Sequence, residues 1–198
     1  MPRLFFVTDP TRVSDIPAIL VELPARTGVI YRHFGQSVPA SFEEIRHICQ
    51  KRKLHLFVSW PAPVFMQRHG VHYHLPERAW RGMRRVDLAK LRGRGRTRSM
   101  ISVAAHSPAA MRGAFFADTI LFSPIFATDS ARTRGTFWGL MRAARIACRF
   151  HSRKTTGTTL IGLGGIGDAT SQRVLKAGFD GVGAISGLVS DFVRRPRL

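Results

Sequence analysis

Cysteines, acidic residues and long apolar runs are all scarce in this sequence, and each scarcity excludes a class of protein. The 198 residues include two cysteines, too few for a disulfide framework or a four-cysteine zinc site. No run approaches the ~20 apolar residues that cross a bilayer, and the N-terminus shows no signal-peptide pattern. We therefore expect a cytoplasmic protein that inserts in no membrane. We also expect Cys49 and Cys148 to be buried in helices.

Acidic residues are outnumbered by basic ones. The chain has 12 Asp and Glu against 31 Lys and Arg, which gives a formal net charge of +19. Such a charge attracts polyanions, anionic surfaces and phosphorylated small molecules, but it does not determine the fold. Hydrophobic residues make up 44% of the chain, which excludes intrinsic disorder and is sufficient for one core. We expect a single domain over residues 1–198.

Eight short apolar runs alternate with segments of helical pattern. The runs are continuous, which is typical of strands buried on both faces of a parallel sheet. The predicted strands are Leu4–Thr8, Gly28–Arg32, Leu54–Trp60, Gly70–Leu75, Met100–Ala105, Thr119–Phe126, Thr159–Gly164 and Gly181–Ile185. Eight such units, each followed by a helix, predict a (β/α)₈ TIM barrel. A doubly wound open sheet is the alternative, because strand order cannot be read from a sequence.

The helical segments differ in how clearly they are marked. We expect Ser41 and Asp168 to cap two helices, and we expect others at 108–116, 137–150 and 186–194. The arginine-rich segment from Glu77 to Ser99 contains several glycines, so we expect a short helix followed by a loose loop. Its basic residues have little aromatic interleaving, which favours a solvated surface without specific nucleic-acid binding.

Glycine-rich turns follow the last two predicted strands. The segment 162–168 follows the seventh strand and leads into a helix, and the segment 185–187 follows the eighth. In barrels, phosphate is commonly bound by these two loops, because backbone N–H groups and a helix N-terminus face the anion. We expect a phosphorylated small molecule to contact Thr128, Ser130, Gly164, Gly165, Ile185 and Ser186.

Several segments resemble the thiamine phosphate synthase family, which includes a thiazole tautomerase branch on the same barrel. The similar segments are 4–9, 70–72, 123–128, 163–166 and 177–186, in the same order and spacing. The resemblance implies a thiazole-phosphate-like ligand. The family's synthase joins a pyrimidine diphosphate to a thiazole phosphate. It uses Mg²⁺ held by carboxylates, together with Lys or Arg at the leaving diphosphate.

The residues that the resemblance assigns to the pyrimidine, the diphosphate and the metal are mostly replaced. Of the second-strand pattern only Arg32 is retained. The Asn-Asp pair after the third strand reads Ser59-Trp60, and the lysine after the sixth strand is replaced by Ala131. Glu77 is at most a single metal ligand, so we expect Mg²⁺ only if synthase activity is retained. The residues assigned to the thiazole phosphate are mostly kept.

In the tautomerase branch a histidine follows the fifth strand, and His106 lies at the matching place. Imidazole titrates near neutral pH and suits proton transfer. We therefore favour tautomerase-like acid/base chemistry with His106 and Arg32 as catalytic residues. His33, His72 and His74 are expected to face the same pocket, without a third metal ligand. Two alternatives stay open: a true thiamine phosphate synthase, and a non-catalytic basic binding protein.

Overall fold

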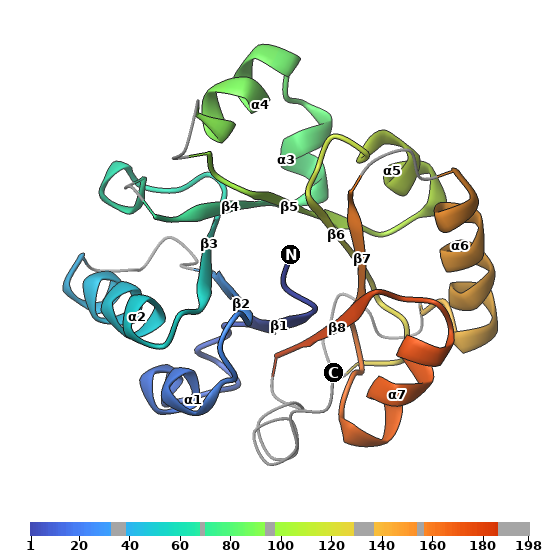
Figure 1. Cartoon of the computed structure of the whole chain (residues 1–198), viewed down its shortest axis with the longest axis horizontal. Helices are drawn as coiled ribbons and strands as arrows, with labels where there is room; N and C mark the ends of the chain where they lie inside the picture. The colour runs from blue at the N-terminus through green and yellow to red at the C-terminus, as the bar shows by residue number, and fades with distance from the viewer. Residues whose placement is uncertain (33–38, 68–69, 94–97, 129–136, 154–156, 186–198) are drawn as a thin grey trace.

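Eight parallel strands close into a barrel in the computed structural model, which describes all residues except 33–38, 68–69, 94–97, 129–136, 154–156 and 186–198 (Figure 1). Neighbouring strands follow the chain order, and β1 pairs with β8 to close the ring. The strands are β1 (Leu4–Val7), β2 (Gly28–Tyr31), β3 (His55–Ser59), β4 (His72–Leu75), β5 (Ile101–Ala105), β6 (Thr119–Phe122), β7 (Thr159–Gly162) and β8 (Gly181–Ala184). The predicted (β/α)₈ barrel is confirmed, and the open sheet is excluded.

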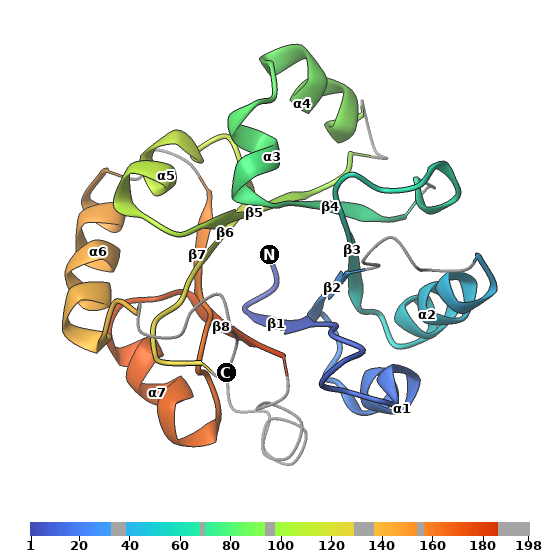
Figure 2. The same ribbon diagram turned by 180° about the vertical axis from the view of Figure 1, so that it is seen from behind.

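Helices surround the strands in Figure 1 and in the view from behind (Figure 2). They are α1 (Ile16–Glu22), α2 (Pro39–Lys51), α3 (Glu77–Arg81), α4 (Arg85–Arg92), α5 (Pro108–Gly113), α6 (Leu140–Arg153) and α7 (Asp168–Lys176), with a 3-10 helix η1 (Val64–Met66). Polar caps fix two helix starts: Asp15 accepts the Ala18 N–H at 3.0 Å, and Ser107 accepts the Ala110 N–H at 3.1 Å. Within the described residues no helix has the length and apolarity to span a membrane.

The third β/α unit departs from the expected pattern. Between β3 and β4 the described residues form only the single turn η1, where an α-helix was expected. Pro61 and Pro63 lie in this short connection. Proline lacks a backbone N–H and disfavours helical geometry in the residue before it. The connection therefore returns to the barrel without an α-helix.

Other helix boundaries also differ from the expectations. The helix α2 begins at Pro39, so Ser41 lies inside it, and Gly167 rather than Asp168 is the N-cap of α7. The basic segment forms two short helices, α3 and α4, where one was expected; Gly82 ends the first of them. The predicted helix at 186–194 lies outside the described residues.

Both faces of the strands are packed. The side chains facing the barrel axis form one cluster of Phe5, Val7, Ile30, Phe57, Leu121 and Ile161. Their sequence neighbours, such as Phe6 and Val29, belong to a second cluster between the strands and the helices. Gly28 leaves space for the Phe5 ring, because a Cβ there would lie 2.4 Å from a ring carbon. This double burial explains why the strands read as continuous apolar runs.

Two arginines of the basic segment have a structural role at the amino end of the barrel. Asp118, just before β6, accepts the Ile101 N–H at 2.8 Å. It also pairs with Arg92 at 3.1 Å and with Arg98 at 3.6 Å. The chain start lies inside the ring of strands in both ribbon views (Figures 1 and 2). These contacts tie β5, β6 and the basic segment together at the amino end of the barrel.

His72 also lies at the amino end of the barrel. It is the first residue of β4, its ring lies 5.0 Å from that of Phe57, and its Nδ1 accepts the Met100 N–H at 3.2 Å. Burial lowers the pKa of His72 to about 4, with a smaller contribution from His55. The expectation that His72 faces the pocket at the opposite end was wrong, because it starts the strand rather than ending it.

The two cysteines differ in environment. Cys49 on α2 is buried, and burial raises the pKa of its thiol to about 12. Cys148 on α6 is exposed, so the expectation of burial was wrong for this residue. The amphipathic helix α6 packs Ala143, Ala147 and Phe150 inward, and Cys148 lies on a different face.

Candidate functional site

The carboxyl ends of the strands meet at the other end of the barrel. All eight strands are parallel, so the residues that follow them approach one another at this end, as in other barrels of this kind. We call this region the barrel mouth and define it by Asp9, Arg32, His74, His106 and the turn Leu163–Gly165.

At the end of β1 and β2, two polar residues position Arg32. The hydroxyl of Thr8 accepts the backbone N–H of Arg32 at 2.9 Å. The carboxylate of Asp9 lies 3.8 Å from the Arg32 guanidinium and also accepts the Thr11 N–H and hydroxyl at 3.1 and 2.6 Å. The Asp9 side chain is 12% exposed and that of Arg32 is 34% exposed. The guanidinium is thus oriented by buried groups while part of it faces solvent.

His74 lies on β4, two strands further round the barrel from β2. Its Nδ1 is 3.0 Å from the hydroxyl of Ser102 on β5. Burial lowers the pKa of His74 to about 3, with smaller contributions in the same direction from Arg32 and His106. His74 is therefore neutral at physiological pH. The influence of both charges also indicates that Arg32 and His106 lie near the same imidazole.

His106 directly follows β5 and is held at two points. Its backbone N–H donates to Oε2 of Glu77 at 2.7 Å. Its ring Nδ1 lies 3.1 Å from both the carbonyl oxygen and the hydroxyl of Ser123, which follows β6. A carbonyl oxygen only accepts, so the first contact requires a proton on Nδ1 and leaves the lone pair on Nε2. Among the described residues Nε2 has no hydrogen-bond partner, and the residue is exposed.

Glu77 is bound on both carboxylate oxygens. It is the first residue of α3, and its Oε1 pairs with Arg81 one turn later at 2.9 Å while Oε2 accepts the His106 N–H. The side chain is 18% exposed. Glu77 thus fixes the backbone beside the candidate catalytic histidine. Both of its oxygens therefore already have a protein partner.

The glycine turn after β7 packs against the loop after β6. The carbonyl oxygens of Leu163 and Gly164 accept the N–H groups of Ile125 and Phe126 at 2.9 and 3.0 Å. Gly164 and Gly165 have φ of +94° and +65°. A Cβ on Gly164 would lie 2.7 Å from Pro124. Only glycine fits here, because the conformation is left-handed and the two loops are in direct contact.

The amides of this turn are open. The N–H groups of Gly164 and Gly165 make no hydrogen bond within the described part of the chain. Two consecutive glycines with positive φ lie just before α7, whose N-cap is Gly167. Unbonded N–H groups at a left-handed turn beside a helix N-terminus are suited to an anion.

Of the four other predicted ligand residues, two are described by the structure and two are not. Thr128 is half-buried at the end of the loop that covers Gly165, whose ideal Cβ would lie 2.6 Å from the Ala127 carbonyl oxygen. Ile185 follows β8 and packs on the inner cluster of the barrel. Ser130 and Ser186, like His33, lie outside the described residues.

The donor set does not fit the Mg²⁺ that the family's coupling reaction requires. Ser59 ends β3 and Trp60 follows it, at the place where the resemblance implies a metal-binding aspartate, and each oxygen of Glu77 already makes one contact. Across the described ranges, no group of three or more His, Cys, Asp or Glu side chains is arranged to hold a metal ion. Mg²⁺ is bound by several oxygen ligands. The described part of the barrel mouth does not bring such a set of ligands together.

The sequence analysis missed three contributors to the mouth. Asp9, Ser102 and Ser123 orient Arg32, His74 and His106 respectively. Asp9 and Ser123 come two residues after the inward-facing Val7 and Leu121, just beyond the ends of β1 and β6, whereas Ser102 is the second residue of β5. That period-two placement was the available signal. The partner of each could not be known before the strand register was known.

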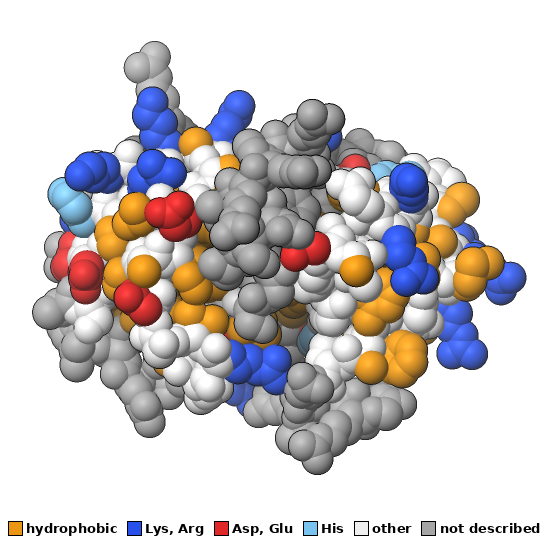
Figure 3. All heavy atoms as spheres, turned by 90° about the horizontal axis from the view of Figure 1, so that it is seen from below, with side chains coloured by type: hydrophobic (Ala, Val, Ile, Leu, Met, Phe, Trp, Pro, Cys, Tyr) orange, Lys and Arg blue, Asp and Glu red, His pale blue; other side chains and the backbone are white. Residues whose placement is uncertain are grey.

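Positive charge is not confined to the mouth. On the face shown in Figure 3, Lys and Arg side chains are scattered over both halves of the molecule and are not gathered into one stripe. A phosphate backbone is usually bound by a basic patch or stripe. The arrangement on this face is instead that of a solvated basic surface.

Comparison with known proteins places this geometry in a family. A family model described as "Thiamine monophosphate synthase" (TMP-TENI) matches residues 4–188, whereas a search of curated proteins finds no significant match. The fold is similar to thiamine phosphate pyrophosphorylase from Pyrococcus furiosus, with TM-score 0.66, 18% identity, and coverage of 97% of this chain and 90% of that one. It is also similar to nitroalkane oxidase from Streptomyces ansochromogenes, with TM-score 0.62, 16% identity, and coverage of 92% and 64%. The chain belongs to the thiamine monophosphate synthase family.

Proposed function

We propose that this protein binds a thiazole-phosphate-like ligand at the barrel mouth and moves a proton on its ring, with His106 as the acid/base group. The observation that supports this most directly is the double anchoring of His106. Glu77 holds its backbone N–H at 2.7 Å, and Ser123 contacts its Nδ1 at 3.1 Å. A general base needs a fixed position and a nitrogen with a free lone pair, and the exposed Nε2 meets both requirements.

The phosphate of the ligand is placed at the glycine turn after β7. The N–H groups of Gly164 and Gly165 are unbonded among the described residues, and the N-terminus of α7 adds partial positive charge. Thr128, which follows β6, and Arg32, which follows β2, supply a hydroxyl and a guanidinium from two different sides of the mouth. A phosphate monoester that binds such donors brings its attached ring toward the strand ends where His106 lies.

The proton transfer depends on the backbone carbonyl of Ser123. With Nδ1–H donated to the Ser123 carbonyl, Nε2 removes a proton from one atom of the ligand ring. The resulting imidazolium keeps its Nδ1–H bond to the same carbonyl, which stabilises the positive charge. Nε2 then returns the proton to a second ring atom, so that the ligand is isomerised and the enzyme is unchanged. Neutral His74 and charged Arg32 complete the polar wall around this step.

Coupling of a pyrimidine diphosphate is the less favoured reaction. This coupling reaction expels diphosphate as the leaving group. The negative charge of the diphosphate must be neutralised by a metal ion and cationic side chains. The described mouth offers no matching set of carboxylates, and the family's lysine after strand six is Ala131. Proton transfer on a phosphorylated ring needs neither group.

The experiment supplies the protein with a thiazole phosphate and follows exchange and relocation of the ring proton by NMR. The expected result is isomerisation by the wild type and a drop of about 10²- to 10⁴-fold in His106→Asn, which is the usual contribution of one acid/base group. A parallel assay adds the pyrimidine diphosphate and Mg²⁺. Rapid formation of the coupled product, or an unchanged rate in His106→Asn, contradicts the proposal.

A further inference from the structure

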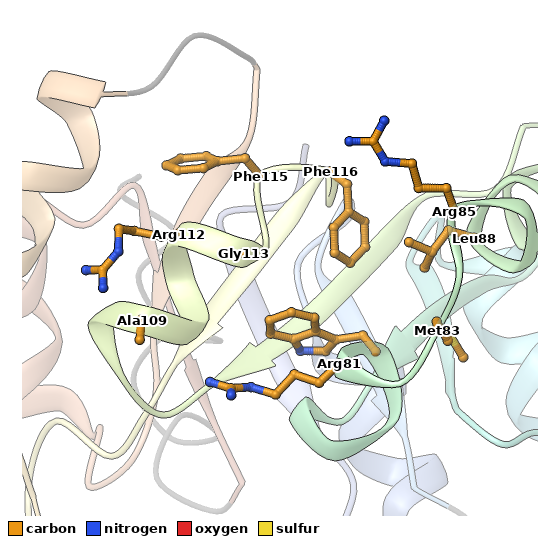
Figure 4. Close-up of a pocket in the computed structure, with 10 residues that line it drawn as sticks. Arg81, Met83, Arg85, Leu88, Ala109, Arg112, Gly113, Phe115 and Phe116 are labelled. Atoms are coloured by element: carbon orange, nitrogen blue, oxygen red, sulfur yellow. The ribbon is translucent and has the colours of Figure 1, made fainter.

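A pocket lies on the outer layer of the barrel, away from the mouth residues. It is bounded by α3 and α4 on one side and by α5 with the segment leading to β6 on the other, and its volume is about 550 Å³. Figure 4 shows Arg85 and Leu88 across from Arg112 and Phe115, with Phe116 between them. A volume of this size accommodates a small organic ligand.

The floor of the pocket is aromatic and fixed. The rings of Trp80 and Phe116 meet edge to face with centroids 5.9 Å apart. The indole N–H of Trp80 donates to the carbonyl oxygen of Ala104 on β5 at 2.9 Å. Phe115 is stacked on Phe150 of α6 with centroids 5.5 Å apart. Phe115 and Phe116 are both partly exposed, so the pocket offers preformed aromatic surface to a ligand.

The rim of the pocket is basic. Arg81, Arg85 and Arg112 line it, and its lining includes no acidic residue. Arg81 pairs with Glu77 and lies 5.8 Å from the Trp80 ring centre. Arg85 and Arg112 are exposed and have no ion-pair partner in the described part of the chain. In Figure 4 the guanidinium groups of Arg81 and Arg112 lie at one end of the pocket and that of Arg85 at the other.

We propose that this pocket is a second ligand site, which binds an aromatic ring carrying a phosphate group. The ring gains contact area on the Phe116 and Trp80 surface, where aromatic pairs add about 0.5–1.5 kcal/mol beyond their buried area. The phosphate pairs with Arg85 or Arg112, because guanidinium binds phosphate through two parallel hydrogen bonds. A ligand that has only the ring, or only the phosphate, makes only one of these two kinds of contact. Nucleotides and simple aryl phosphates share this chemistry.

The first experiment separates the ring from the phosphate. Adenosine 5′-monophosphate, adenosine and inorganic phosphate are titrated into the full-length protein at 150 mM salt by calorimetry. The proposal expects the monophosphate to bind at least tenfold more tightly than either fragment. Phenyl phosphate is a fourth probe: affinity equal to that of the nucleotide assigns recognition to ring and phosphate alone, and a weaker affinity shows that the nucleoside contributes. Equal affinity of the nucleotide and inorganic phosphate overturns the proposal.

The second experiment locates the site. Arg85→Gln combined with Arg112→Gln removes two unpaired surface charges and is expected to weaken nucleotide binding at least tenfold. The matched control removes two exposed arginines of α6, Arg142 and Arg145, with the same loss of net charge. The assigned indole N–H resonance of Trp80 is expected to shift on binding. Equal weakening in both double variants, or a Trp80 resonance that does not move at saturation, shows general charge attraction and overturns the site.

Discussion

Glu77 and His106 are joined by a hydrogen bond of 2.7 Å, from the backbone N–H of His106 to Oε2 of Glu77. The other oxygen of Glu77 pairs with Arg81 on the same helix. One carboxylate at the start of α3 thus ties the segment after β5 to the helix beside it. This acid, which the sequence suggested as at most a single metal ligand, holds the backbone of the candidate catalytic residue.

Glu77→Ala is therefore expected to lower both stability and activity. The loss of this acceptor from an exposed N–H costs about 0.5–1.5 kcal/mol in the free energy of unfolding. Because His106 loses an anchor, we expect kcat to fall more than KM changes. Urea unfolding and steady-state kinetics measure the two effects. Glu77→Gln keeps an oxygen that accepts the His106 N–H, and is expected to recover most of kcat. Failure of Gln to exceed Ala in kcat would refute this positioning role.

Gly165→Ala tests the phosphate-binding turn. The φ of +65° costs an alanine about 1–2 kcal/mol, and its Cβ would lie 2.6 Å from the Ala127 carbonyl oxygen. The turn or the loop after β6 must move, and the N–H groups facing the anion move with it. We expect a lower free energy of unfolding and at least tenfold weaker binding of a thiazole phosphate, measured by denaturation and calorimetry.

Gly157→Ala is the control for this substitution. Gly157 precedes β7, and a Cβ there meets nothing within 4 Å. Replacing glycine at an unstrained site changes stability by about 0.4–1 kcal/mol in the favourable direction. Ligand affinity in Gly157→Ala is expected to equal that of the wild type. If Gly165→Ala binds the phosphate as tightly as Gly157→Ala does, the ligand does not use this turn.

The sequence predicted the strands well because burial on both faces leaves a continuous apolar run. The inner residue Phe57 and its outward neighbours Leu56 and Val58 are all buried, so no polar residue interrupts the run. Helix content was harder to predict. The helix predicted between β3 and β4 is absent from the described residues of a segment that contains two prolines. The basic segment forms two helices, one on each side of Gly82, where one was predicted. Short connections depend on local breakers more than on apolar periodicity.

The candidate site was predicted only in part, for a different reason. His106, Arg32 and the glycine turn are marked by residue type and by position after a strand. The partners of these residues come from other strands: Ser123 is 17 positions from His106, and Ser102 is 28 positions from His74. Such pairs depend on strand register, which no local pattern contains. Likewise, His72 and His74 read alike in sequence but lie toward opposite ends of β4.

Stability is expected to fall as pH is lowered, through His72 and His74. Burial depresses the pKa of His72 to about 4 and that of His74 to about 3, against an ordinary value of 6.5. Below pH 6.5 the unfolded chain takes up protons that the folded protein excludes, so stability decreases from pH 6.5 down to about 3. The slope is at most about 1.4 kcal/mol per pH unit for each histidine. Urea unfolding at a series of pH values measures it.

His74→Gln separates the contribution of this histidine from general acid effects. Glutamine does not titrate and retains an amide that contacts the Ser102 hydroxyl. The pH dependence of stability is expected to become shallower between pH 6 and 4. His47→Gln, an exposed substitution on α2, is the matched control. A pH profile that is equally steep in both variants would assign the acid sensitivity to other groups.

Arg32 is expected to contribute directly to binding of the anionic ligand. Its backbone N–H is held by Thr8 at 2.9 Å, and its guanidinium lies 3.8 Å from Asp9 with about a third of the side chain exposed. Arg32→Gln removes the charge but keeps a hydrogen-bonding side chain. Loss of one charged hydrogen bond costs about 1.5–3 kcal/mol, so a thiazole phosphate should bind roughly ten- to a hundredfold more weakly. Arg12→Gln, an exposed arginine in the loop after β1, removes the same charge without touching the mouth. Calorimetry at constant ionic strength compares the two variants. A specific contact between Arg32 and the ligand would make Arg32→Gln bind more weakly than Arg12→Gln. Equal affinities of the two variants would therefore mean that Arg32 acts only through the net charge of the protein.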